Sequence, residues 1–175
     1  MGKTAKITNL AMLLTFAVVI HFIENLVPLP IPVPGAKLGL ANVIVLLTLL
    51  VFGLRSGLVV AVGKSILGSI FTGGFLGFGF WLSISAALIS CLIMASFIPI
   101  SRQGYITVIS VSIMGAVFHN LTQLGMASVI MENFTLFQGY FPLLVLVAMP
   151  TGFLTGLAAG YLEDLVRRNL GLLGA

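Results

Sequence analysis

Proline, glycine and charged residues divide this sequence into six apolar segments, and this division most limits the folds open to the chain. A helix needs about 20 mostly apolar residues to cross the hydrocarbon core of a bilayer. The prolines at positions 28, 30, 32 and 34 exclude a helix between the first two segments. The segments use almost the whole chain, so the sequence predicts a single all-α domain over residues 1–175. We expect a compact bundle of six transmembrane helices at about 8–27, 38–53, 57–72, 75–98, 105–131 and 140–166.

The scarcity of charged residues supports the same fold class. Charged residues make up 7% of the chain and hydrophobic residues 59%, whereas a soluble domain has about 25% charged and about 45–50% apolar residues. So few charges could not cover a water-facing surface, which excludes soluble enzymes and disordered chains. The basic residues are spread over several regions and form no patch for nucleic acid. The single Cys91 excludes an internal disulfide and a metal site built from cysteines.

The basic residues also predict the orientation of the bundle, because lysine and arginine are enriched in cytoplasmic loops. In the six-span arrangement they fall on one side of the membrane, and only Lys37 lies at a margin of the other side. The residues on the shared side are Lys3, Lys6, Arg55, Arg102, Arg167 and Arg168. We therefore expect both termini in the cytoplasm. The first segment is too long and too interrupted by polar residues to be a cleaved signal peptide.

Several polar side chains lie inside the predicted spans, where exposure to lipid is costly. Such residues usually face the interior of a bundle or a watery cavity. His21 and Asn25 are four residues apart, as are His119 and Gln123, so each pair shares a helix face. Most of these residues belong to the half of the membrane opposite the termini. We predict an outward-facing substrate pocket there. Its candidate residues are Glu24, Lys37, Asn42, Lys64, Trp81, His119, Asn120 and Gln123.

Most of these residues also have a purely structural interpretation. Lys37 could extend to the headgroups from a helix end, and Glu24 could balance Lys37 or Lys64 in the packed bundle. The polar residues of the fifth span could hold helices together, and Asn42 by itself favours a structural role. Trp81 is typical of the aromatic belt at the membrane interface. Lys64 is the hardest to explain in this way, because a lysine near the membrane midplane has no short route to water.

Small residues recur at every fourth position in the last span. Gly152, Gly156 and Gly160 form a face that lets another helix approach closely, more often within a protein than on a partner. No catalytic group is recognisable. Asp164 is the only aspartate, so there is no Asp-rich pair for magnesium–diphosphate chemistry, and neither a His-Glu-x-x-His motif nor a phosphate-binding loop occurs. We expect this chain to be no enzyme and to carry no metal or other cofactor.

The run Pro34-Gly-Ala-Lys-Leu-Gly-Leu-Ala-Asn42 resembles the signature of a bacterial family called Gx transporter or heptaprenyl diphosphate synthase component I. Lys64-Ser65, the Thr72-Gly-Gly turn and His119-Asn-Leu-Thr-Gln123 extend this resemblance over most of the chain. The family is similar to the substrate-binding (S) components of energy-coupling factor (ECF) transporters. Those small six-helix proteins bind a vitamin or precursor from outside and then topple within a larger complex.

The resemblance implies that this chain is an S component in the bacterial cytoplasmic membrane. Its partners would be an ECF coupling transmembrane protein and two ATPase subunits, which use the ATP. In the resembling family the first span carries a small-residue docking motif, which would fall here on Ala11 and Thr15 with Ala17 nearby. The bilayer and a small-molecule substrate complete the expected partners, and no nucleic acid is among them.

Two functions from different classes remain open. One is the substrate-binding transport subunit. The other is a membrane-embedded, non-catalytic partner of a polyprenyl diphosphate synthase, and the short loops around Arg55 and Arg102 disfavour it. Lys37, Lys64 and His119 favour an anionic group in the substrate, and the aromatic fourth span favours an apolar or flat remainder. We expect a small anionic amphipathic or aromatic molecule, such as a vitamin, isoprenoid or quinone precursor.

Overall fold

The computed structural model describes residues 2–26 and 39–169. These residues form six α-helices, which are α1 (Lys3–Leu26), α2 (Asn42–Phe52), α3 (Leu54–Phe71), α4 (Phe78–Arg102), α5 (Val108–Ile130) and α6 (Phe134–Asn169). Five of them are long and apolar enough to cross a membrane, whereas α2 has only 11 residues. By helix length and hydropathy the chain is a multi-pass membrane protein. The predicted all-α bundle is therefore confirmed, whereas the second span, predicted over about 38–53, is the shorter helix Asn42–Phe52.

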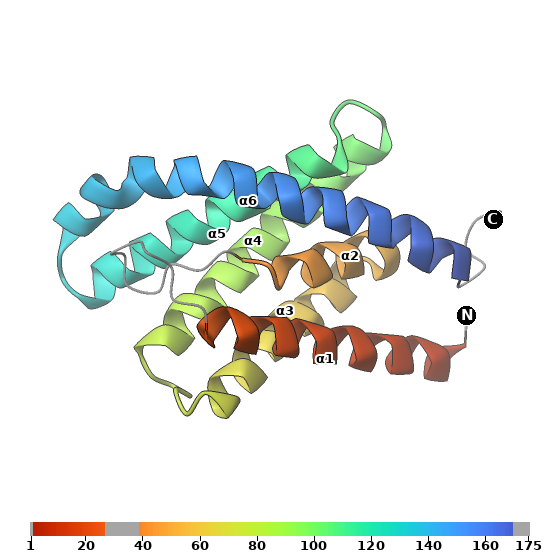
Figure 1. The fold of residues 1–175 in the computed structure, drawn as a ribbon, viewed down its shortest axis with the longest axis horizontal. Helices are drawn as coiled ribbons and strands as arrows, with labels where there is room; N and C mark the ends of the chain where they lie inside the picture. The colour runs from red at the N-terminus through yellow and green to blue at the C-terminus, as the bar shows by residue number, and fades with distance from the viewer. Residues whose placement is uncertain (1, 27–38, 170–175) are drawn as a thin grey trace.

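The two termini lie at the same end of the bundle (Figure 1). The junction of α2 with α3 and the loop between α4 and α5 also lie toward this end, which we call the termini end. The turns from α3 to α4 and from α5 to α6 lie toward the opposite end, which we call the turn end. The basic residues that predicted the orientation all belong to helix ends or loops at the termini end.

Helix α2 is the centre of the bundle. Every residue from Asn42 to Leu50 is buried, and α2 packs against α1, α3, α4 and α6. With 11 residues it is about 16 Å long, roughly half the thickness of the hydrocarbon core. Gly53 ends it with φ of 80°, a left-handed conformation that glycine adopts without strain, and α3 starts at the next residue. The first turn of α2 therefore lies inside the bundle rather than at a membrane surface.

Two of the described helices, α4 and α6, contain prolines that do not end them. The fourth span, predicted over about 75–98 and so to end just before Pro99, continues in the structure as α4 to Arg102. Pro99 lies in the last turn, so it disturbs the hydrogen bonds of a helix that is about to end. Helix α6 starts at Phe134, earlier than predicted, and contains Pro142 and Pro150. Membrane helices tolerate such prolines because neighbouring groups bind the freed backbone carbonyls.

The small-residue face of α6 packs against α5 in the same chain. A Cβ atom at Gly152 would lie 2.6 Å from Cα of Ile113, and one at Gly156 would lie 2.7 Å from Cα of Ile109. These approaches are possible only without a side chain on α6. Gly160 has no such neighbour within 4 Å in the described part of the chain. The interpretation that this face packs within the protein is confirmed for the first two glycines.

Candidate functional site

Buried polar side chains meet at the first turn of α2. Lys64 of α3 is 2% exposed, and its Nζ donates a hydrogen bond of 2.6 Å to Oδ1 of Asn42. The sequence places this pair symmetrically, because each residue is 11 positions from Gly53. The chain reverses at Gly53, so equal numbers of residues on both sides bring Asn42 and Lys64 to the same level. The result is a lysine amino group held deep inside a membrane bundle.

Glu24 of α1 caps the N-terminus of α2. Its carboxylate accepts hydrogen bonds from the backbone N–H groups of Leu40 at 2.5 Å and Ala41 at 3.4 Å. These N–H groups belong to the turn just before α2, where the helix dipole places partial positive charge. The carboxylate therefore stabilises a helix end that is buried in the bundle. The structure thus gives Glu24 a structural contact, with backbone amides as its partners.

The polar residues of α5 face three different surroundings. Nδ1 of His119 lies 3.4 Å from Oγ of Ser90 on α4. Nδ2 of Asn120 donates to the backbone carbonyl of Leu144 on α6 at 3.4 Å. Oε1 of Gln123 is buried and has no hydrogen-bond partner among the described residues. A buried acceptor without a donor costs about 1–3 kcal/mol, so Gln123 is the residue of this group best suited to receive a donor from a bound molecule.

A cavity of about 150 Å³ lies between α1, α3 and α4 at the turn end. Its polar lining consists of the imidazole of His21 and the hydroxyls of Ser65, Ser69, Thr72 and Ser83. The hydroxyl of Ser83 donates to that of Ser65 at 3.2 Å. None of these hydroxyl residues was among the substrate-binding residues predicted from the sequence. One sequence pattern could have predicted part of this lining. Ser65 and Ser69 are four residues apart and therefore share one face of α3.

Glycine allows His21 to reach this cavity. A Cβ atom at Gly68 would lie 2.4 Å from Cδ2 of His21, so the imidazole rests directly on the backbone of α3. Among the residues that the structure describes, no three His, Cys, Asp or Glu side chains come together as a group that could hold a metal ion.

The sequence matches the model of the family "heptaprenyl diphosphate synthase component I" over residues 13–162. The chain belongs to this family. No curated protein and no solved structure shows significant similarity to it. The matched range includes Asn42, Lys64, His119 and Gln123.

The candidate residue Trp81 lies apart from these buried polar residues. Trp81 is 45% exposed, and its ring packs edge-on against Phe80 with the ring centroids 5.3 Å apart. Phe80 lines the cavity, so Trp81 supports the cavity wall from outside. Lys37 and the preceding part of the signature lie outside the described residues, as does the side chain of Asn25.

The candidate docking residues do not share one environment. Ala11 and Thr15 are exposed on α1, and Oγ1 of Thr15 donates to the backbone carbonyl of Ala11 at 2.9 Å. Ala17 has no exposed surface and packs in the core of the bundle. The exposed small-residue face of α1 therefore contains Ala11 and Thr15, and Ala17 packs within the chain.

Proposed function

We propose that this chain is the substrate-binding (S) component of an ECF-type importer in the bacterial cytoplasmic membrane. The observation that carries the proposal is Lys64, a 2% exposed lysine that meets Asn42 at the buried end of a half-length helix. Charged residues inside a membrane protein are costly and mark substrate or ion sites more often than packing contacts. Interrupted helices that end near the midplane form such sites in other transporters.

The proposed substrate is a small anionic molecule with an apolar or aromatic part. The ammonium of Lys64 suits an anionic group, and the buried acceptor of Gln123 suits a hydrogen-bond donor. The cavity beside Ser65 has about 150 Å³ and an aromatic wall at Phe80. A cavity of about this volume has room for a benzene-sized molecule. These features support a vitamin, isoprenoid or quinone precursor.

The chain itself is proposed to be non-catalytic and to depend on partners for energy. It contains no nucleotide-binding motif, so ATP would be used by two ATPase subunits joined to it through a coupling transmembrane protein. Helix α1 supports such docking, because among the described helices it packs mainly on α2 and α3 and exposes Ala11 and Thr15. Small side chains allow the close backbone approach that helix association in membranes requires.

The description of the family favours a second candidate, a non-catalytic membrane partner of a polyprenyl diphosphate synthase. Such a partner needs a surface for a soluble protein. The described connections at the termini end are short, since Gly53 alone joins α2 to α3 and residues 103–107 join α4 to α5. These short connections support the transport function over the role of a synthase partner. Co-purification of a synthase subunit with the chain, without an ATPase, would support the role of a synthase partner instead.

The experiment that tests the transport function begins with native mass spectrometry of the purified protein, which identifies a co-purified ligand. The affinity of that ligand is then measured for the unchanged chain and for Lys64→Met, which keeps length and removes charge. We expect affinity to fall by about 1–3 kcal/mol, the size of a lost hydrogen bond to a charged group. The fold should remain intact.

Ser112→Ala is the matched control. It removes a buried hydrogen bond of 2.8 Å to Thr155 between α5 and α6, away from the cavity. We expect this variant to lose thermal stability and keep its ligand affinity. Unchanged affinity together with lost stability in Lys64→Met would instead assign Lys64 to the packing of the bundle.

A further inference from the structure

Three hydroxyl groups that line the cavity between α1, α3 and α4 already donate their protons to other groups of the protein. Oγ of Ser69 donates to the backbone carbonyl of Ile66 at 2.8 Å, and Oγ of Ser65 donates to that of Ala61 at 3.2 Å. Oγ of Ser83 on α4 donates to Oγ of Ser65 at 3.2 Å. A hydroxyl has one proton to donate and two lone pairs that accept. Each of these three oxygens can therefore still accept a hydrogen bond, but none has a second proton to donate.

These acceptors lie on the inner side of the cavity. Ser65, Ser69 and Ser83 are 0%, 7% and 5% exposed, whereas Phe78 and Gly79 in the first turn of α4 are exposed and lie at the opening. Among the described residues, the lining includes no Asp, Glu, Lys or Arg. An anionic group at the inner side would face the lone pairs of three oxygens. The inner side therefore favours a ligand group that donates hydrogen bonds.

The size of the cavity and its aromatic wall indicate what carries this donor. A volume of about 150 Å³ has room for a benzene-sized ring. Phe80 is 6% exposed, and its ring packs edge-on against those of Phe75 and Trp81, with ring centroids 5.2 and 5.3 Å apart. Aromatic rings pair favourably in offset and edge-on arrangements. The ring of Phe80, held between two others, therefore offers a fixed surface for a flat ring in the cavity.

We propose that this cavity binds a benzene-sized ring that carries a hydroxyl or amino group, and that this group donates hydrogen bonds to the inner serine oxygens. The proposal rests on the transport function proposed above and specifies the neutral part of its substrate. The anionic group of the same molecule lies outside the inner side of the cavity. The hydroxyl or amino group thus distinguishes the substrate from purely apolar rings and from rings that only accept hydrogen bonds.

Para-substituted benzoates test the proposal, because they share one carboxylate and one ring and differ in a single substituent. Para-hydroxybenzoate and para-aminobenzoate donate hydrogen bonds, para-methylbenzoate has a substituent of similar size without a polar group, and para-cyanobenzoate only accepts. Their affinities for the purified protein in detergent are measured by isothermal titration calorimetry.

Two double variants are compared with the unchanged chain. The cavity variant carries Ser69→Ala and Ser83→Ala, which remove two of the three inner oxygens. The control variant carries Ser85→Ala and Ser96→Ala, two serines of α4 outside the cavity. The hydroxyl of each control serine donates to a backbone carbonyl of its own helix at 2.7 Å. The control therefore matches the loss of two serine hydroxyls without changing the cavity.

We expect para-hydroxybenzoate and para-aminobenzoate to bind the unchanged chain roughly two- to tenfold more tightly than the other two probes, the range for one hydrogen bond. The cavity variant should lose this preference and the control variant should keep it. Equal or tighter binding of para-cyanobenzoate would overturn the proposal. So would the absence of binding by any probe at millimolar concentration, or the same preference in both variants.

Lys64→Met separates this proposal from the transport function on which it rests. It should weaken the binding of all four probes by a common factor and leave the preference for donors unchanged. A preference that persists while no affinity depends on Lys64 would support the donor site and contradict the anion site at Lys64. Weaker binding of all four probes without any preference among them in the unchanged chain would support the anion site and overturn the donor site.

Discussion

At the scale of single residues, charged side chains from other helices bind both ends of α2. The carboxylate of Glu24 binds the backbone N–H groups just before α2. At the other end, Arg102 and Arg167 both donate to the carbonyl of Leu50, at 2.8 and 2.9 Å. A helix dipole favours an anion at the N-terminus and cations at the C-terminus. Side chains from α1, α4 and α6 therefore hold the short central helix in place electrostatically.

We predict that Glu24→Gln lowers the thermal stability of the protein in detergent. Glutamine keeps the size of the side chain but removes the charge that the helix N-terminus favours, a loss of about 1–2 kcal/mol for a buried contact. Glu132→Gln is the control, because Glu132 is exposed in the turn between α5 and α6. Equal unfolding temperatures for both variants would show that the cap contributes nothing to stability.

At the scale of helices, the contact between α5 and α6 depends on the absence of side chains. Gly152→Ala places a methyl group 2.6 Å from a backbone atom of α5, so the helices must separate. We predict a loss of about 1–3 kcal/mol, which is usual for overpacking. Gly160→Ala, with no described atom within 4 Å, should be neutral or slightly stabilising because alanine favours helix. Thermal unfolding of both variants checks this, and equal destabilisation would contradict it.

Helix α1 is the element that we expect to meet the transport partner. Ala11→Trp places a bulky side chain on its exposed small-residue face. We predict that uptake and co-purification with the coupling protein are lost, while ligand binding by the isolated chain stays near normal. Leu154→Trp on the exposed face of α6 serves as the control for added bulk. Loss of binding together with uptake would place Ala11 in the packing of the bundle instead.

At the scale of the whole molecule, both termini lie at one end of the bundle, together with the basic helix ends (Figure 1). The enrichment of lysine and arginine in cytoplasmic loops predicts that this end faces the cytoplasm. In a Cys91→Ser background, Gly2→Cys should react with an impermeant thiol reagent only from the cytoplasmic side. Asn133→Cys, in the turn between α5 and α6, should react only from outside. Labelling on the opposite sides would reverse the orientation.

Much of the architecture could be predicted from the sequence, because hydrophobic length and helix-breaking residues are local properties. The all-α class, the number of helices and most of their positions followed from the apolar segments and their punctuation. The burial of Lys64 also followed, because exposure of a lysine to lipid near the middle of a span is costly. The length of α2 did not follow. Its apolar segment gave no sign that the helix begins only at Asn42.

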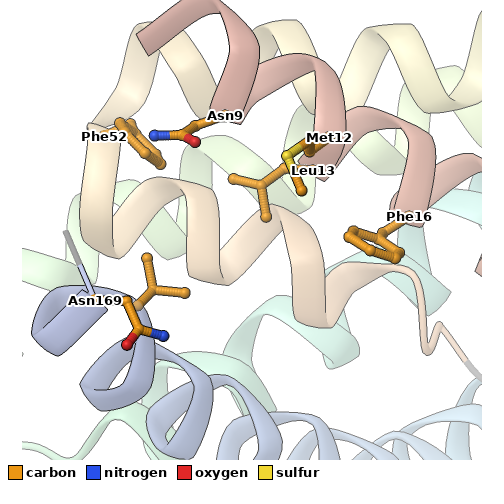
Figure 2. Close-up of a pocket in the computed structure, with 7 residues that line it drawn as sticks. Asn9, Met12, Leu13, Phe16, Phe52 and Asn169 are labelled. Atoms are coloured by element: carbon orange, nitrogen blue, oxygen red, sulfur yellow. The ribbon is translucent and has the colours of Figure 1, made fainter. Parts of the chain in front are cut away.

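The partners of the polar residues were decided by tertiary structure. Glu24 accepts hydrogen bonds from backbone N–H groups because α1 lies against the start of α2. The cavity lined by His21 exists because α1, α3 and α4 meet next to Gly68. An apolar groove lined by residues of α1 and α6 likewise includes Phe52 of α2, the helix that packs against both (Figure 2). Periodicity fixes which residues share a face of one helix. Which faces then meet depends on close packing between segments far apart in the chain, and no local pattern encodes it.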